Sequence, residues 1–184
     1  MDLRNQDRGG IALDANVFTF LVEAFAQGYQ PDADPDRRLR IERVAALQAY
    51  LYAPDEFFLP PTVRVEASKI SDRKRRLEHS SVAQVLISDL VGLDYSAVAE
   101  RMRELLADHS GEADCRILAE AEAGGVAGLL TFDDDFTKHL AARSPVALKS
   151  PSTYLVQLEV PPGSTPRRRP HVLSPLASES WWRL

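Results

Sequence analysis

Short apolar runs alternate along this chain with longer stretches in which apolar residues recur three and four positions apart. The short runs end at polar or helix-breaking residues and predict β-strands. They lie at 11–13, 57–59, 126–130 and 145–148, and the run at 90–93 is either a further strand or a connection. The longer stretches predict helices at about 15–27, 36–52, 61–70, 82–87, 95–108, 112–123 and 151–158. This alternation predicts an α/β fold with a mostly parallel sheet between two helical layers, a three-layer α/β/α, Rossmann-like architecture.

The composition of the chain changes near residue 159. Residues 1–158 are predicted to form one domain, preceded within it by a loose polar lead-in over 1–10. Residues 159–184 are rich in proline and arginine and predict a flexible or extended C-terminal tail. Two explanations of Trp181 and Trp182 stay open, because the pair either binds a partner or docks on the domain and pins the tail back.

The bulk composition excludes several classes of protein. The chain has 184 residues, of which 45% are hydrophobic and 27% charged, as is ordinary for a globular protein. No apolar run approaches membrane-spanning length, and the polar start has no secretory signal, so we expect a cytoplasmic protein with no membrane partner. Cys115 is the single cysteine, which excludes a disulfide framework and predicts a packing role for its side chain. The net charge of −5 does not indicate a nucleic-acid binder, although a group of acids that holds cations would contribute to that sum.

Acidic residues stand at the ends of two predicted strands and on two predicted apolar helix faces. Asp14 follows the first run and Asp133 follows the run at 126–130, so both are expected at the sheet edge where open α/β folds bind ligands. Glu66 and Asp114 lie three and four positions from apolar residues of their helices. Simpler explanations stay open for single residues, since Asp14 is also a typical helix cap and Glu66 also fits a helix edge that reaches water.

Four carboxylates in one cleft would repel one another unless cations or protons neutralised them. Hard divalent cations prefer oxygen ligands, and magnesium commonly takes one or two carboxylates together with waters and phosphate oxygens. Such a site suits the cleavage of a phosphodiester bond by an activated water. The acids Asp14, Glu66, Asp114 and Asp133 are therefore the predicted catalytic and metal-binding residues.

Four sequence segments, in this order, resemble the PIN domain family, and in style the small VapC-like toxin ribonucleases. The resemblance covers about residues 11–158 and rests on LDANVF, TVRVEASKI, ADCRILAEAEAGG and LLTFDDDF. By the family's pattern Asp14, Glu66, Asp114 and Asp133 bind the metal. Asp135 matches a further acid of the last motif and by that pattern belongs to the metal site, where it holds a metal-bound water. Asn16 and Thr131 match small polar residues that orient the acids.

The resemblance implies a PIN-like α/β/α fold, Mg²⁺ or Mn²⁺ as cofactor, and endonucleolytic cleavage of RNA. It also implies frequent homodimers and, for a toxin of a toxin–antitoxin pair, a small protein antitoxin as partner. A catalytically inactive PIN-fold module that binds RNA or protein is the main alternative. A phosphohydrolase with an aspartyl nucleophile is a weaker one, because such enzymes need a second Asp where this chain has Asn16.

The histidines of the chain are scattered, and none pairs at metal-ligand spacing. They are predicted to be surface or cap residues: His79, His109, His139 and His171.

Overall fold

The computed structural model describes residues 8–184, and those residues contain a five-stranded parallel sheet in the order β3-β2-β1-β4-β5. The strands are β1 (Arg8–Leu13), β2 (Glu56–Leu59), β3 (Ser88–Asp89), β4 (Val126–Leu130) and β5 (Ala147–Lys149). Because β1 and β4 have partners on both sides, they form the middle of the sheet, and their apolar residues supply much of the core.

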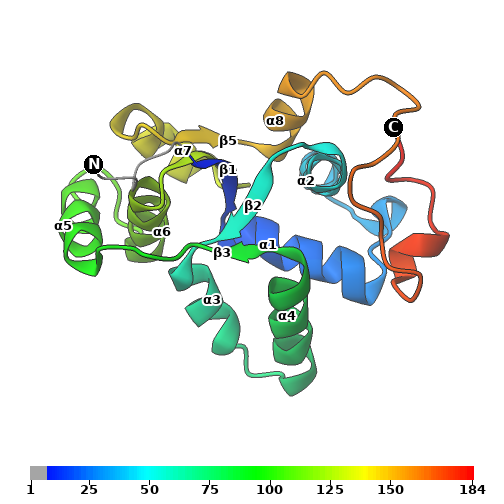
Figure 1. Ribbon diagram of the computed structural model, residues 1–184, viewed down its shortest axis with the longest axis horizontal. Coiled ribbons are helices and arrows are strands. Elements are labelled where there is room, and N and C mark those ends of the chain that lie inside the picture. Colours follow the sequence, from blue (N-terminus) through cyan, green and yellow to red (C-terminus); the bar gives the residue numbers. More distant parts are fainter. Residues whose placement is uncertain (1–7) are drawn as a thin grey trace, which may run out of the picture.

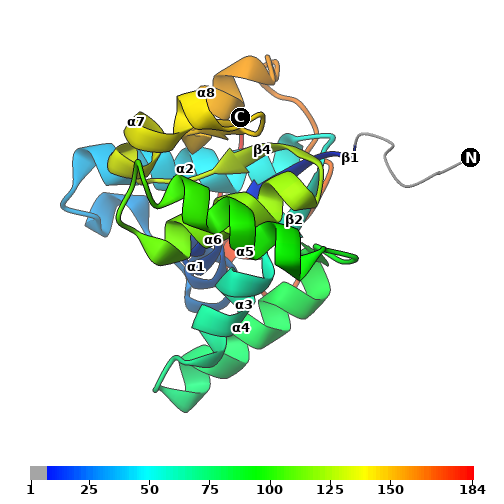
Figure 2. The same ribbon diagram turned by 90° about the vertical axis from the view of Figure 1, so that its left-hand side faces the viewer.

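Helices connect the strands and cover the sheet on both faces, so the predicted three-layer α/β/α fold is confirmed (Figure 1). The helices are α1 (Ala15–Val22), α2 (Arg37–Tyr52), α3 (Pro61–Ser68), α4 (Arg73–Leu86), α5 (Tyr95–Leu105), α6 (Glu112–Ala123), α7 (Asp134–Leu140) and α8 (Pro151–Gln157). Helices α2 and α8 pack together, and α3 and α4 project as a pair from the opposite side of the molecule (Figures 1 and 2). No helix among residues 8–184 is long and apolar enough to cross a bilayer.

Most predicted elements are present with shifted ends. The predictions for 112–123 and 126–130 match α6 and β4. Strand β1 begins at Arg8, so the lead-in predicted to reach residue 10 is too long, and residues 1–7 of it lie outside the described part. The strand option at 90–93 was wrong, because only Ser88–Asp89 pairs with β2 and the chain leaves the sheet beyond it. The last strand is shifted from 145–148 to Ala147–Lys149.

Several helix boundaries in the structure differ from the predicted ones. The first helix is α-helical only to Val22 and continues as a π-helix over Glu23–Gln27, ending at Gly28 with a left-handed φ of 72°. Thr62 does not cap α3, since Pro60 holds the cap position and offers no side-chain hydrogen bond. The helix predicted to reach residue 108 ends at Leu105.

The strand order creates a crevice at the carboxyl ends of β1 and β4. From β1 the chain proceeds outward to β2 and β3, whereas from β4 it proceeds the other way to β5. The loops that leave β1 and β4 therefore turn to opposite sides, which opens a gap between them. The backbone N–H of Asp14 donates to the carbonyl of Leu130 at 3.0 Å, so the two loops begin next to each other.

The C-terminal segment 159–184 packs on the domain, so the pinned explanation of its tryptophans holds. Leu176 and Trp182 are buried, and the Trp182 indole N–H donates to the Leu176 carbonyl at 3.0 Å. The Arg168 guanidinium donates to the carbonyls of Tyr50 and Ala53, each at 2.9 Å, at the C-terminal end of α2. A cation at that position satisfies free carbonyls and complements the helix dipole.

We expect Trp182→Ala to lower the free energy of unfolding by about 3 kcal/mol, because it empties a buried aromatic site and removes the anchor of the tail. Leu173→Ala is the matched control, since Leu173 is 85% exposed in the same segment and its loss should cost less than about 0.5 kcal/mol. Urea denaturation measures both. Equal midpoints for the two variants would show that the segment does not pack on the domain.

Candidate active site

Asp14 and Asp133 occupy equivalent positions on the two central strands. Asp14 follows β1 as the N-cap of α1, and Asp133 follows β4 as the N-cap of α7. The Oδ1 atom of Asp133 accepts backbone N–H groups of Asp135 at 2.8 Å and Phe136 at 3.0 Å. Both carboxylates therefore face the positive end of a helix at the crevice between β1 and β4.

Thr131 links these two acids through one hydroxyl. The Thr131 side chain is buried, and its hydroxyl donates to Asp14 Oδ2 at 2.7 Å. The same oxygen accepts the backbone N–H of Asp133 at 3.0 Å. Thr131 thus orients the Asp14 carboxylate and ties the start of α7 to it. Asn16 lies exposed in the first turn of α1, and within residues 8–184 it makes no hydrogen bond to the acids.

Two further acids, Asp114 and Glu66, stand on helices, and Asp114 acts on Asp14. Burial raises the pKa of Asp14 to about 6 against the opposing hydrogen bond from Thr131, and the charges of Asp114 and Asp133 raise it further. The pKa of Glu66 on α3 is also raised, by burial first and then by the charge of Asp114 in the first turn of α6. The charge of Asp114 therefore acts on both Asp14 and Glu66, and the charge of Asp133 acts on Asp14.

His109 is a member of the site that the sequence did not reveal. Its Nε2 lies 2.9 Å from Asp114 Oδ2, its Nδ1 lies 4.0 Å from Asp135 Oδ2, and its ring stacks on Phe136 with centroids 5.9 Å apart. The His109 side chain is 8% exposed, so the prediction of a surface histidine was wrong here. It was wrong for buried His79 as well, whereas His139 and His171 are exposed.

Glu120 is a second residue that the sequence analysis missed. Its carboxylate on α6 is 1% exposed and accepts the backbone N–H of Thr62 at 2.9 Å and the Thr62 hydroxyl at 2.7 Å. Since Pro60 offers no capping side chain, Glu120 caps α3 from a neighbouring helix. This contact fixes the helix of Glu66 against the helix of Asp114. A signal was present, because Glu120 stands three positions after Ile117 on the apolar stripe.

A family model described as PIN domain matches residues 11–140, a span that includes all four acids and both strands that carry Asp14 and Asp133. This chain belongs to the PIN domain family. The matched span ends with α7, so β5 and α8 lie beyond it, and β5 adds a strand to the sheet by pairing with β4.

One solved structure resembles this PIN-domain chain over most of its length. It is a crystal structure of VapBC2 from Rickettsia felis bound to a DNA fragment from their promoter. The two chains share 14% identity with a TM-score of 0.45, and the match covers 76% of this chain and 96% of the other. No curated protein matches the chain.

The acids of this PIN domain fit a hard divalent cation in donor type and charge. All are carboxylates, and burial and mutual repulsion penalise the ionised form of Asp14, which a bound cation would relieve. Within residues 8–184, however, no three such side chains surround a common point at metal-ligand geometry. Asp114 is turned toward His109, and Asp133 Oδ1 is held by its own helix. The ligand set therefore stays a prediction.

The raised pKa of Asp14 predicts a pH-dependent loss of stability in metal-free protein. Since the folded-state pKa of about 6 exceeds the ordinary 3.8, the folded state binds more protons between these values and loses stability as pH rises through them. The effect amounts to about 3 kcal/mol for a shift of this size. In EDTA, the stability of Asp14→Asn relative to the natural chain should rise by about that amount from pH 4 to pH 7, measured by urea denaturation. A difference that does not change with pH would contradict it.

Glu120→Ala should lower the free energy of unfolding by about 2 kcal/mol, because it leaves the half-buried Thr62 N–H and hydroxyl without their acceptor. Glu104→Ala is the control on an exposed ion pair with Arg101, and it should cost about 0.5 kcal/mol. Chemical denaturation of both variants tests the role of Glu120. Similar small losses for the two variants would show that Glu120 does not fasten α3 to α6.

Proposed function

We propose that this PIN-domain protein is a metal-dependent endoribonuclease that hydrolyses phosphodiester bonds of RNA with Mg²⁺ or Mn²⁺. The observation that carries the proposal is the group of like charges around buried Asp14 at the crevice between β1 and β4. Two of them, Asp114 and Asp133, raise its pKa, and no Lys or Arg is among the causes of that shift. Such an arrangement is costly in a protein that has no cation to bind there.

In this proposal Asp14, Glu66, Asp114 and Asp133 would hold the cation, and Asp135 would hold a water beside it. A bound divalent cation supplies an acidified water and neutralises charge on the phosphate. Thr131 fixes the orientation of Asp14. Glu120 holds α3 against α6, and this contact keeps the helix of Glu66 next to the helix of Asp114. The phosphorus is attacked by water, so the protein needs no nucleophile of its own.

We further propose that the enzyme is the cytoplasmic toxin of a toxin–antitoxin pair, with a small protein antitoxin and a homodimer as its assemblies. Support comes from the order of the motifs and from the projecting α3–α4 pair. That pair exposes aliphatic side chains, with Val65 at 51%, Leu77 at 57% and Val85 at 77% exposure. Exposed aliphatic groups gathered on one projection are typical of a protein-binding surface.

Asp14→Asn and Asp133→Asn should each lower magnesium-dependent RNA cleavage by at least about a hundredfold, because each removes a charge that the cation needs. The matched control is Asp32→Asn, since Asp32 is exposed in the short helix Pro31–Ala33 and should leave cleavage unchanged. Cleavage of structured RNAs is followed by gel with Mg²⁺, Mn²⁺ or EDTA. No cleavage by the natural chain, together with RNA binding, would favour the inactive PIN-fold module instead.

A further inference from the structure

A cavity of about 540 Å³ opens beside the candidate acids, on the side of α1 and α2. Its lining includes Asp133 and Asp135 together with Asn16, Phe20, Arg43 and Phe132. An occupant of this cavity touches the same carboxylates that the proposed function uses. The volume exceeds that of one nucleobase several-fold, so there is also space for a ribose.

Two aromatic rings form the apolar walls of the cavity. Phe20 and Phe132 have centroids 6.4 Å apart with an angle of 65° between their planes. Phe20 is buried, whereas Phe132 is half-buried and lines the cavity together with Asp133 and Asp135. A partly exposed ring beside a charged site offers a stacking surface for a planar group.

Arg43 forms part of the cavity wall and is already held in place. Its guanidinium lies over the rings of Phe20 at 5.7 Å and Tyr29 at 5.6 Å, and its Nη1 pairs with Asp34 at 3.0 Å. These contacts hold the Arg43 side chain in place in the cavity wall before any ligand binds. Preorganised walls lower the entropic cost of binding.

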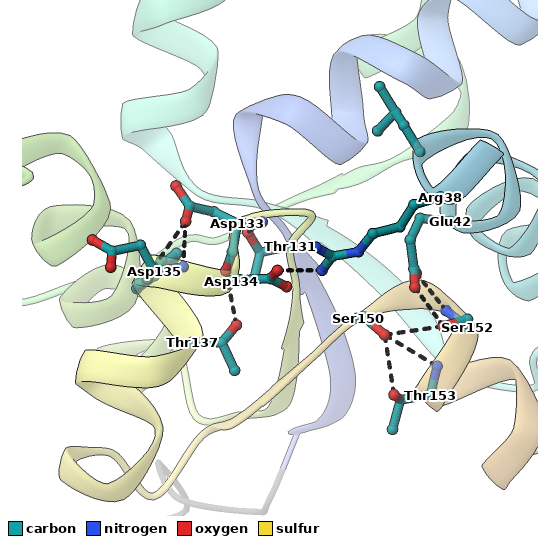
Figure 3. A network of polar contacts seen from close by, with 12 residues as sticks. Arg38, Glu42, Thr131, Asp133, Asp134, Asp135, Thr137, Ser150, Ser152 and Thr153 are labelled. Carbon is teal, nitrogen blue, oxygen red and sulfur yellow. Dashed lines mark hydrogen bonds and ion pairs between the residues drawn. The ribbon is translucent and has the colours of Figure 1, made fainter. Parts of the chain in front are cut away.

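The charges at the cavity suit a neutral planar ligand better than a phosphate. The acids Glu23 and Asp134 also line it, but each has a basic partner: Arg75 lies 3.6 Å from Glu23, and Arg38 reaches across from α2 to Asp134 (Figure 3). The carboxylates that remain belong to the candidate metal acids. Carboxylate and hydroxyl oxygens accept the N–H groups of a nucleobase, whereas a phosphate here would be repelled.

We propose that this cavity holds one unpaired nucleotide of the RNA substrate, with its base stacked on Phe132 and its phosphate directed to the cation that the acids would hold. The inference rests on the proposed ribonuclease function and deepens it, because it assigns Phe132 as the residue on which a base of the substrate stacks. Single-stranded RNA is bound in this way because its bases are free to stack on aromatic side chains.

The experiment uses a short RNA whose cleavage site has been mapped with the full chain and Mg²⁺. Abasic residues replace the nucleotides around the cleaved bond one at a time, and kcat/KM is measured for each RNA. For the natural chain, one abasic position should lower kcat/KM by roughly tenfold or more, the loss expected for one stacked base.

The variants Phe132→Leu and Phe132→Ala test whether that base lies on Phe132. Each should cleave the intact RNA roughly tenfold less well and should lose no further activity with the abasic RNA, because the stacking partner is already gone. Phe132→Leu retains an apolar side chain of similar size, so it covers the case in which the alanine variant fails to fold. Val156→Ala is the control, since Val156 is 76% exposed on α8 and should behave as the natural chain does.

The outcomes separate the two proposals. If the natural chain cleaves RNA but no abasic position matters, or if Phe132→Leu remains as sensitive as the natural chain, the cavity proposal is overturned and the nuclease proposal stands. If the natural chain cleaves no RNA with either cation, both proposals are overturned together.

Discussion

The hydrogen bond from Thr131 to Asp14 is the constraint on which the site depends. It joins the ends of the two central strands, and it is made by side chains that are both buried. Because the Asp14 carboxylate has left water and lies near other acids, its ionised form is disfavoured and needs compensation from within the fold. One threonine hydroxyl supplies part of that compensation, and the same oxygen holds the backbone of Asp133. One side chain therefore orients the Asp14 carboxylate and fixes the backbone at Asp133.

The positions of Asp14 and Asp133 at the sheet edge were predictable from the sequence, because each residue follows an apolar run that forms a strand of the parallel sheet. The helix of Asp114 and strand β4 were also predictable, because their patterns are long and bounded by glycines. Strand β3 was misplaced, because a two-residue strand has no period to detect. The family match at residues 11–140 confirms the PIN-domain resemblance.

The residues that could not be predicted act through tertiary contacts. His109 contacts Asp114 only because the loop before α6 folds back over the helix start, and no spacing rule encodes that. Glu120 caps a helix that is distant in sequence, so no local pattern points to its contact with Thr62. Local patterns specify where a helix lies, whereas the contacts between helices decide which polar side chains support the acids.

The distance along the chain between Thr131 and Asp14 has a consequence for biosynthesis. The two residues are 117 positions apart, and β1 gains β4 as a neighbour only when both have been made. In a nascent chain that has not yet released β4 from the ribosome, Asp14 has neither its hydroxyl donor nor Asp133 beside it. Pairing over such a separation comes late in folding, because a long loop must close first. The group of acids thus assembles only after most of the protein has been translated.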